Sequence, residues 1–454
     1  MSTLSPVITP PAASKLPGPK GLPLLGSLLD LRRDPLGFFE HLAHRYGDTV
    51  AFRIGPRRAL FLNDPGLIER ILVAEHRDFP KISFIWRQFT AVFGQGLVTS
   101  HGGLWQRQRR LCAPAFTPVR LAAYAEVIVR ATERTLDGWQ VGEIRDLHAD
   151  IMALTLRIVA ETLFGVGIED DIARIEAAIH DLNREMAARM VRPVLIPDAV
   201  PLPGHVRYRR GLACIEDVAT RIIRQRRTAP STGHNLLDAL MEARDETGAP
   251  MSDHQLRDEA VTFLLAGHET TALALTWALD LLGQHPEVRA ALAAEAVAVL
   301  GERPATFEDL PRLARAEQVV NESLRLYPPA WLIGREAGRD CEIGGHPVPA
   351  GTPLYTSPWV LHRDPRFWSE PLSFRPDRWA EYSDRRRPRF AYMPFGGGPR
   401  ICVAQRFAVM EAVLILASMA RRYSLVPVQQ GPVAPFPSIT LRPAAPVRFR
   451  VHAR

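Results

Sequence analysis

An apolar helical run from Ser252 to about Gln284 limits the possible folds of this chain more than any other feature. Ser252 and Gln255 have the spacing of a capping box, in which two side chains satisfy free backbone N–H groups at a helix start. At a rise of 1.5 Å per residue the helix would be about 48 Å long. This length predicts that the helix crosses a whole domain.

The rest of the chain predicts a mainly α fold with a minor β region. Residues from about 105 to 300 have helical periodicity with few breakers, whereas residues 330 to 400 are rich in Pro and Gly. We expect a flexible tail over 1–14 and a single domain over 15–454. Short strands are predicted at Thr49–Ile54, Arg58–Leu62, Cys341–Ile343 and Pro353–Ser357, and further helices at Asp64–Ala74 and Val403–Tyr423.

The composition is that of a globular protein with a basic surface. The 454 residues are 46% hydrophobic and 23% charged, with a net charge of +7. Arginines are scattered and not interleaved with aromatic residues, so we expect solvated basic faces and no nucleic acid partner. We expect no membrane span, because no run reaches about 18 apolar residues, and no signal peptide. A cytoplasmic, reducing compartment fits four cysteines that form no CxxC pair: Cys112, Cys214, Cys341 and Cys402.

The strongest local signal is the run from Phe395 to Cys402. Its three glycines, starting at Gly396, allow the backbone to bend tightly and approach a flat ligand. Arg400 offers a cation for a carboxylate. Cys402 then opens an apolar helix, where free N–H groups favour a thiolate, the proximal ligand that drives O–O cleavage at a haem iron. A cysteine alone would more often be a small buried residue.

A second signal lies inside the long helix, at Ala266-Gly267-His268-Glu269-Thr270-Thr271. Glycine within a helix costs about 1 kcal/mol relative to alanine, so Gly267 needs a reason, such as room for a ligand. Thr270 and Glu269 could bind and relay protons. The alternative is a helix kink with solvated polar residues.

A third signal is Glu322 and Arg325, which share a helix face. An isolated pair of this kind is usually a surface salt bridge that contributes little to stability.

Together these runs resemble the cytochrome P450 family. Residues 395–402 match its haem-binding pattern FxxGxRxCxG, except that Ala404 replaces the last glycine; residues 266–271 match (A/G)Gx(D/E)T(T/S) at every position. Glu322 and Arg325 match ExxR, with Arg378 in the later segment Phe374–Trp379. The resemblance covers nearly the whole chain and implies the P450 fold, with haem b between the long helix and the Cys loop.

The resemblance also implies roles for single residues. Cys402 would ligate the iron, and Thr270 and Glu269 would deliver protons to dioxygen. Glu322, Arg325 and Arg378 would form a structural network. Further haem contacts are implied or proposed at Trp105 and Arg109, which match a WxxxR helix, and at Arg335, His101, Arg400, Phe395, Gly396, Ala266 and Gly267.

A lipophilic substrate is expected on the other side of the haem: a fatty acid, terpenoid, steroid or polyketide-like molecule. Residues Phe79–Leu97 are predicted to form a loop over it, and Arg189–Pro203 an access lid between two helices. The expected lining residues are Phe84, Trp86, Phe89, Phe93, Phe263, Ala266, Ala330, Leu332 and Ile333.

The expected activity is insertion of one oxygen atom from O2, with NAD(P)H electrons from a separate reductase chain. Arg107, Arg110 and Arg406 could form a basic patch for an acidic ferredoxin or flavodoxin, and we expect a monomer. Two alternatives stay open. One is a peroxygenase that uses H2O2, against which the intact Glu269–Thr270 pair argues. The other is a haem-based sensor without turnover.

Overall fold

The computed structural model describes residues 16–165, 171–190, 200, 202–228, 235–380 and 387–454. The predicted tail at 1–14 and most of the predicted lid Arg189–Pro203 lie outside the described residues.

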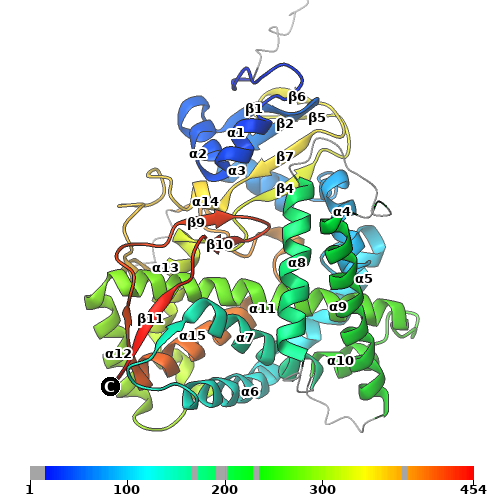
Figure 1. The fold of residues 1–454 in the computed structure, drawn as a ribbon. Helices are drawn as coiled ribbons and strands as arrows, with labels where there is room; N and C mark the ends of the chain where they lie inside the picture. The colour runs from blue at the N-terminus through cyan, green and yellow to red at the C-terminus, as the bar shows by residue number, and fades with distance from the viewer. Residues whose placement is uncertain (1–15, 166–170, 191–199, 201, 229–234, 381–386) are drawn as a thin grey trace, which may run out of the picture.

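Helix α11 (Asp253–Gln284) runs across the molecule and organises the fold (Figure 1). The predicted capping box is present: the Ser252 hydroxyl accepts from the Gln255 N–H, and the Gln255 side chain accepts from the Ser252 N–H. Most of its 32 residues are buried, because helices pack round it on several sides. Its principal neighbours are α7 (Leu147–Val159), α9 (Pro203–Thr228), α13 (Ala314–Leu326) and α15 (Gln405–Arg422).

The remaining helices complete the helical part and connect it to the sheet. The Asp64–Ala74 prediction is confirmed as a short α-helix followed by a π-helical turn at Arg70–Ala74. The remaining α-helices are α1 (Leu28–Arg33), α2 (Pro35–Tyr46), α3 (Pro65–Glu69), α4 (Ser83–Phe93), α5 (Gly102–Cys112), α6 (Pro118–Asp137), α8 (Ile172–Met190), α10 (Leu236–Glu242), α12 (Pro286–Leu300) and α14 (Pro358–Leu361).

A four-stranded sheet lies at the end of the molecule that is uppermost in Figure 1, with the order β1-β2-β7-β4. Within it β2 and β7 are parallel and the other neighbours antiparallel. Its strands are β1 (Thr49–Ile54), β2 (Arg57–Leu62), β7 (Pro353–Thr356) and β4 (Ile333–Glu336). The smaller sheets join β5 (Cys341–Ile343) to β6 (His346–Val348), β9 (Pro435–Pro437) to β10 (Leu441–Pro443), and β3 (Ile144–Asp146) and β8 (Tyr423–Pro427) to β11 (Arg448–Ala453). The predicted strands are confirmed.

The core follows this division. One large cluster of buried apolar side chains surrounds α11, and two smaller clusters lie on the two faces of the four-stranded sheet. The prediction of a mainly α fold with a minor β region is therefore confirmed.

The prediction of a loop over Phe79–Leu97 is wrong, because Ser83–Phe93 forms α4. Its aromatic residues Trp86, Phe89 and Phe93 are spaced by three and four, which is the period of one helix face. Helix α4 ends at Gly94, whose φ is 57°. The loop that follows is tied to the start of α11, because the Glu259 carboxylate accepts from the Leu97 N–H at 3.0 Å.

Candidate active site

The Cys loop, residues 395–402, is a tight turn that packs against the chain near α3. Gly396 and Gly398 have φ of 73° and 68°, values that favour glycine. A Cβ on Gly398 would lie 1.8 Å from the Leu72 carbonyl oxygen, so no other residue fits there. The Cys402 N–H donates to the Phe395 carbonyl oxygen at 3.0 Å and closes the loop. Two of the three glycines therefore allow the predicted bend, and Gly397 and Gly398 allow close approach to Phe390 and Leu72 of the chain itself; the predicted approach to a flat ligand stays a prediction.

Cys402 lies before the next helix and not at its first residue as predicted, since α15 begins at Gln405 after Ala404. Burial raises the pKa of the Cys402 thiol, while a hydrogen bond from the Ala404 N–H and the charge of Arg109 oppose that rise. The backbone donor is thus present, but burial outweighs it. A metal cation bound at the sulfur would favour the thiolate.

A cavity of about 240 Å³ lies between α11 and the Cys loop, and Cys402 faces it. The cavity walls are almost entirely apolar, as a flat apolar cofactor requires. Gly267 lines this cavity and also allows α7 to approach, because its Cβ position lies 3.2 Å from Val159 Cγ2. The wall residues include Ala266, Thr270, Ala274, Leu324, Pro329, Ala330, Phe395, Ala404, Phe407 and Ala412.

Four basic side chains gather on the elements that flank this cavity: Lys81, His101, Arg335 and Arg400. Arg400 donates to the Ser100 carbonyl oxygen at 2.9 Å, Arg335 to that of Gly334 at 2.8 Å, and Lys81 to that of Val98. No carboxylate among the described residues forms an ion pair with any of the four. Basic groups of this kind without carboxylate partners, three of them partly buried, fit a site for the carboxylates of a cofactor.

The electrostatics of this group agree with that interpretation. Burial, and secondly the charge of Arg400, lowers the pKa of Arg335 to about 10, and burial lowers the pKa of Arg400 to about 10. Burial also lowers the pKa of Lys81 well below its usual value, with Arg335 and Arg400 adding to the effect. The pKa of His101 is lowered by burial and by Arg400 and Lys81. These groups repel one another, so a bound anion would stabilise all of them.

Sequence reasoning identified three members of this group and missed Lys81. One signal was present: Lys81 is the only lysine after residue 20 in a chain that otherwise uses arginine. Its ammonium lies 3.9 Å from the centre of the Trp86 ring.

Trp105 and Arg109 lie one turn apart on α5. Trp105 is buried, and its ring packs beneath the Arg400 guanidinium, whose carbon lies 4.1 Å from the ring centre. Arg109 is half-buried close to Cys402, and burial lowers the pKa of its guanidinium. Trp105 thus positions a predicted anion-binding side chain, while Arg109 contributes positive charge near the sulfur.

A second cavity of about 220 Å³ lies beside the first, between α4, α8, α11 and the turn before β10. The two cavities share Ala266, Thr270 and Ala330. Of the predicted substrate residues, Phe89, Phe93, Ala266 and Ala330 line it. Lining residues that the sequence analysis missed are Val92, Val98, Ile179, Leu182, Asn183, Met186, Leu265, Ile439 and Thr440.

The other five predicted lining residues do not reach this cavity. Phe263 is buried against Phe116, with ring centres 5.9 Å apart. Leu332 and Ile333 each pack against one of the two smaller apolar clusters at the four-stranded sheet. The rings of Phe84 and Trp86 are each covered by a cation. The Arg57 guanidinium lies 4.0 Å from the centre of the Phe84 ring, and the Lys81 ammonium lies over the Trp86 ring. The prediction for Phe84 and Trp86 failed because it assumed a loop over the cavity, whereas these residues lie in the first turn of helix α4.

Thr270 and Glu269 meet at the second cavity. The Thr270 hydroxyl donates to the Ala266 carbonyl oxygen at 2.9 Å. Glu269 Oε1 accepts from the Thr440 hydroxyl and from Arg442, whose Nη2 lies 2.7 Å away, while Oε2 accepts from Asn183 Nδ2 at 2.8 Å. Burial raises the pKa of Glu269, but Arg442 and Thr440 outweigh it, so the pKa lies below the usual value. Glu269 is therefore a carboxylate.

Glu322, Arg325 and Arg378 meet behind the Cys loop in the buried core. Arg325 Nη2 lies 2.8 Å and Arg378 Nε 2.9 Å from Glu322 Oε1. His362 extends the contact to the Cys loop, since its Nε2 accepts from the Met393 N–H at 2.9 Å. Its other ring nitrogen lies 3.2 Å from the Arg325 carbonyl oxygen. Burial lowers the pKa of His362 to about 3, so this link is neutral.

The proposed basic patch needs correction at Arg107. This side chain is half-buried and pairs with Asp245 at 2.6 Å, so it ties α5 to the segment before α11. Arg110 is exposed but pairs with Glu246. Arg406 is exposed. The acidic partners lie about 140 residues further along the chain, which the sequence analysis could not anticipate.

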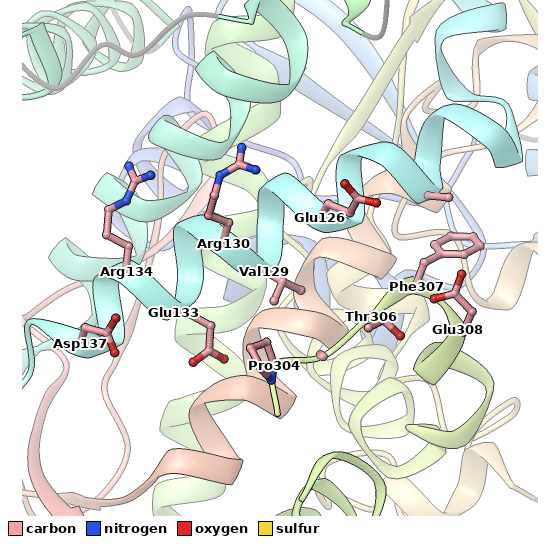
Figure 2. A pocket seen from close by; sticks show the side chains of 12 residues that line it. Glu126, Val129, Arg130, Glu133, Arg134, Asp137, Pro304, Thr306, Phe307 and Glu308 are labelled. Atoms are coloured by element: carbon pink, nitrogen blue, oxygen red, sulfur yellow. The ribbon is translucent and has the colours of Figure 1, made fainter. Parts of the chain in front are cut away.

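A further hollow, of about 650 Å³, is a groove between α6 and residues 304–308, and it shares no lining residue with the two cavities. Figure 2 shows Glu133 pointing towards Pro304, whereas Arg130 and Arg134 point away from it. Both arginines pair with Glu161. The groove is strongly charged and holds none of the motif residues.

An apolar cavity lined by Cys402, together with basic side chains that have no carboxylate partner among the described residues, fits a haem with thiolate ligation. Comparison with known proteins agrees: the family model for cytochrome P450 matches residues 16–449. Cyclooctatin synthase of Streptomyces melanosporofaciens is 37% identical over 434 residues, or 95% of this chain and 94% of the relative. Pentalenene oxygenase of Streptomyces avermitilis is 32% identical over 437 residues, or 96% and 97%. The chain belongs to the cytochrome P450 family.

A third relative, cyclooctat-9-en-7-ol 5-monooxygenase of Streptomyces melanosporofaciens, is 37% identical over 414 residues, or 90% of this chain and 89% of the relative. The protein is therefore a P450 monooxygenase that uses haem and O2. Within the described part of the chain no single helix is long and apolar enough to cross a membrane, although the bent pair Gly102–Phe116 and Pro118–Asp137 meets the length and composition test.

Proposed function

We propose that this enzyme inserts one oxygen atom from O2 into a cyclic terpenoid, by hydroxylation or epoxidation. The observation that carries the proposal is the apolar cavity of about 220 Å³, which adjoins the cysteine-lined cavity at Ala266 and Thr270. Its walls suit a compact hydrocarbon. The names of the relatives, pentalenene oxygenase and cyclooctat-9-en-7-ol 5-monooxygenase, point to the same substrate class.

In this proposal the haem is held at three places. Cys402 is the iron ligand. Lys81, Arg335 and Arg400 bind the propionates, because none of the three has a carboxylate partner among the described residues, and His101 adds a hydrogen bond. Phe395, Ala266 and Gly267 pack against the ring. The bound haem would supply the oxygen-activating chemistry; the protein supplies binding, orientation and protons.

Thr270 and Glu269 are proposed to hold and move protons. The Thr270 hydroxyl already donates to Ala266, so its lone pairs are available on the cavity side. Glu269 Oε1 has three hydrogen-bond donors, two of them on Arg442, whereas Oε2 receives one bond, from Asn183. Oε2 is thus the oxygen with a lone pair free to take a proton while its bond from Asn183 stays in place.

Electrons are proposed to come from NAD(P)H through a separate ferredoxin-type or flavodoxin-type protein. We infer a monomeric, cytoplasmic enzyme in which residues 15–454 act as one haem domain. The exposed Arg406, close to Cys402 in the chain, supports an acidic partner at this face.

The test is a product screen with the haem-loaded enzyme, surrogate ferredoxin and reductase, NADPH and O2. Cyclic sesquiterpenes and diterpenes should give products one oxygen atom heavier, with the atom derived from labelled O2. Fatty acids serve as the comparison class, and their preferential oxidation would contradict the proposal. Turnover with H2O2 but none with the complete electron supply would instead establish the peroxygenase alternative.

A further inference from the structure

The second cavity has one polar corner in otherwise apolar walls. Helix α8 contributes Ile179, Leu182, Asn183 and Met186, which share one helix face. Asn183 is the single polar residue of that stripe. Together with Glu269 and Thr440 it forms the polar corner.

In the hydrogen bonds of this corner one acceptor, Asn183 Oδ1, has no donor among the described residues. Both Glu269 oxygens accept bonds, and the Thr440 hydroxyl gives its proton to Glu269. Asn183 Nδ2 donates to Glu269 Oε2. Among the described residues, none donates to Asn183 Oδ1, although this half-buried side chain lines the cavity.

The orientation of the Asn183 amide follows from chemistry. Arg442 and Thr440 hold the pKa of Glu269 below its usual value, so both of its oxygens are acceptors only. A carbonyl oxygen of Asn183 in place of the nitrogen would set acceptor against acceptor at 2.8 Å. Oδ1 must therefore be the atom that is left for a ligand.

We propose that Asn183 Oδ1 accepts a hydrogen bond from a hydroxyl group of the substrate. The substrate is then a hydrocarbon that already carries a hydroxyl, held with that group at the polar corner and with another carbon presented beside Thr270. This inference rests on the proposed function and deepens it. A prior oxygenation, or a cyclisation that ends in capture of water, must supply such a substrate.

Asn183 determines specificity at this corner because its amide nitrogen and its amide oxygen have separate roles. Nδ2 is held by Glu269, which fixes the side chain, and Oδ1 receives no hydrogen bond from a described residue although Asn183 lines the cavity. A site built to bond a hydroxyl discriminates against the analogue that lacks it, since its own polar group is then left without a partner.

The test uses two matched pairs of probes, α-cedrene with cedrol and abietadiene with abietadienol. Dissociation constants are measured by calorimetry on the haem-loaded enzyme, so that the readout does not depend on turnover. Wild type should bind the alcohol of at least one pair about tenfold more tightly than its hydrocarbon, as one hydrogen bond predicts. Asn183→Leu should remove that preference while leaving the hydrocarbon affinity within about twofold.

Two further variants separate this role from a general disturbance of the cavity. Asn183→Ser keeps an acceptor and should retain part of the preference, whereas Met186→Leu, on the same stripe, should retain all of it. Equal binding of alcohols and hydrocarbons by wild type, or an unchanged preference in Asn183→Leu, overturns the inference alone. If no probe of either kind binds, the proposed terpenoid function fails together with it.

Discussion

Thr270 shows how one hydroxyl can be assigned a task by its surroundings. It lies at the junction of two cavities and donates only within its own helix, to Ala266. Thr276, on the same helix, makes a similar bond to the Ala272 carbonyl oxygen at 2.7 Å and also lies 3.2 Å from His148 Nδ1, but it lines neither cavity. Thr276 therefore serves as the control for loss of a helical hydroxyl away from the cavities.

We predict that Thr270→Ala uncouples electron use from product formation. Without the hydroxyl, protons reach the oxygen site less selectively, so product per NADPH should fall at least about tenfold while peroxide rises. Product and peroxide are measured together in steady state. Thr276→Ala should keep the wild-type ratio, and unchanged coupling in Thr270→Ala would refute the assigned role.

Glu411, on α15, is a fully buried acid. Neither of its oxygens accepts a hydrogen bond of good geometry from a described residue, although Thr271 lies close enough to reduce the shift. Burial raises the pKa of Glu411 to about 8 from 4.5. The folded state thus binds this proton more tightly than the unfolded state, so the free energy of unfolding falls as pH rises from about 4.5 to about 8.

Glu411→Gln should remove this dependence. The free energy of unfolding of the variant, relative to that of wild type, should rise by on the order of 1–3 kcal/mol between about pH 5 and pH 9. The reason is that the variant has no charged carboxylate to bury at high pH. Urea unfolding midpoints at the two pH values provide the measurement. The exposed Glu126→Gln is the control, and an equal effect of pH on both variants would argue against a raised pKa.

At the scale of elements, the contacts of Glu322 hold α13 to the segment before the Cys loop. Two arginines depend on this carboxylate, and Arg325 is completely buried. His362 carries the connection to Met393, two residues before the loop begins. The loop that presents Cys402 is therefore braced from behind.

We predict that Glu322→Gln lowers the free energy of unfolding by about 3–5 kcal/mol, since it leaves buried cations without a counter-charge. Denaturant unfolding followed by circular dichroism measures this. Glu370→Gln is the comparison, because Glu370 pairs with Arg375 at an exposed site and should change stability by less than about 1 kcal/mol. Similar midpoints for both variants would contradict a structural role for Glu322.

Elements governed by local rules could be predicted from the sequence, and contacts between distant segments could not. The capping box and apolar run of α11 determine a helix wherever they occur, and the glycines of the Cys loop have a local reason. Helix α4 was missed because its short aromatic run resembled a loop bounded by glycine. The pairing of Glu269 with Arg442 joins residues 173 positions apart, and nothing near either residue indicates it.

At the scale of the whole molecule, the predicted basic patch keeps only its exposed residues, Arg110 and Arg406. Arg107 pairs inside the fold, whereas Arg406 is free to meet solvent close to Cys402 in the chain. Charge on this face would steer an acidic electron donor.

We predict that Arg406→Glu slows reduction by an acidic ferredoxin about tenfold at low salt, with a smaller effect at high salt. Stopped-flow reduction at several ionic strengths tests this. The control is Arg130→Glu, whose side chain lies beside the charged groove of Figure 2 on α6. Equal rates for wild type and Arg406→Glu would exclude this face as the docking site.

The central claim is that Cys402 holds a haem iron as a thiolate, and the reduced carbon monoxide spectrum tests it most directly. Wild type should give the long-wavelength Soret band of thiolate ligation, and Cys402→Ser should lose that band. Arg107→Gln, on the same helix as Arg109 but at a side chain that pairs with Asp245, should retain it. A short-wavelength band in freshly prepared wild-type protein, or an unchanged band in Cys402→Ser, would contradict the account.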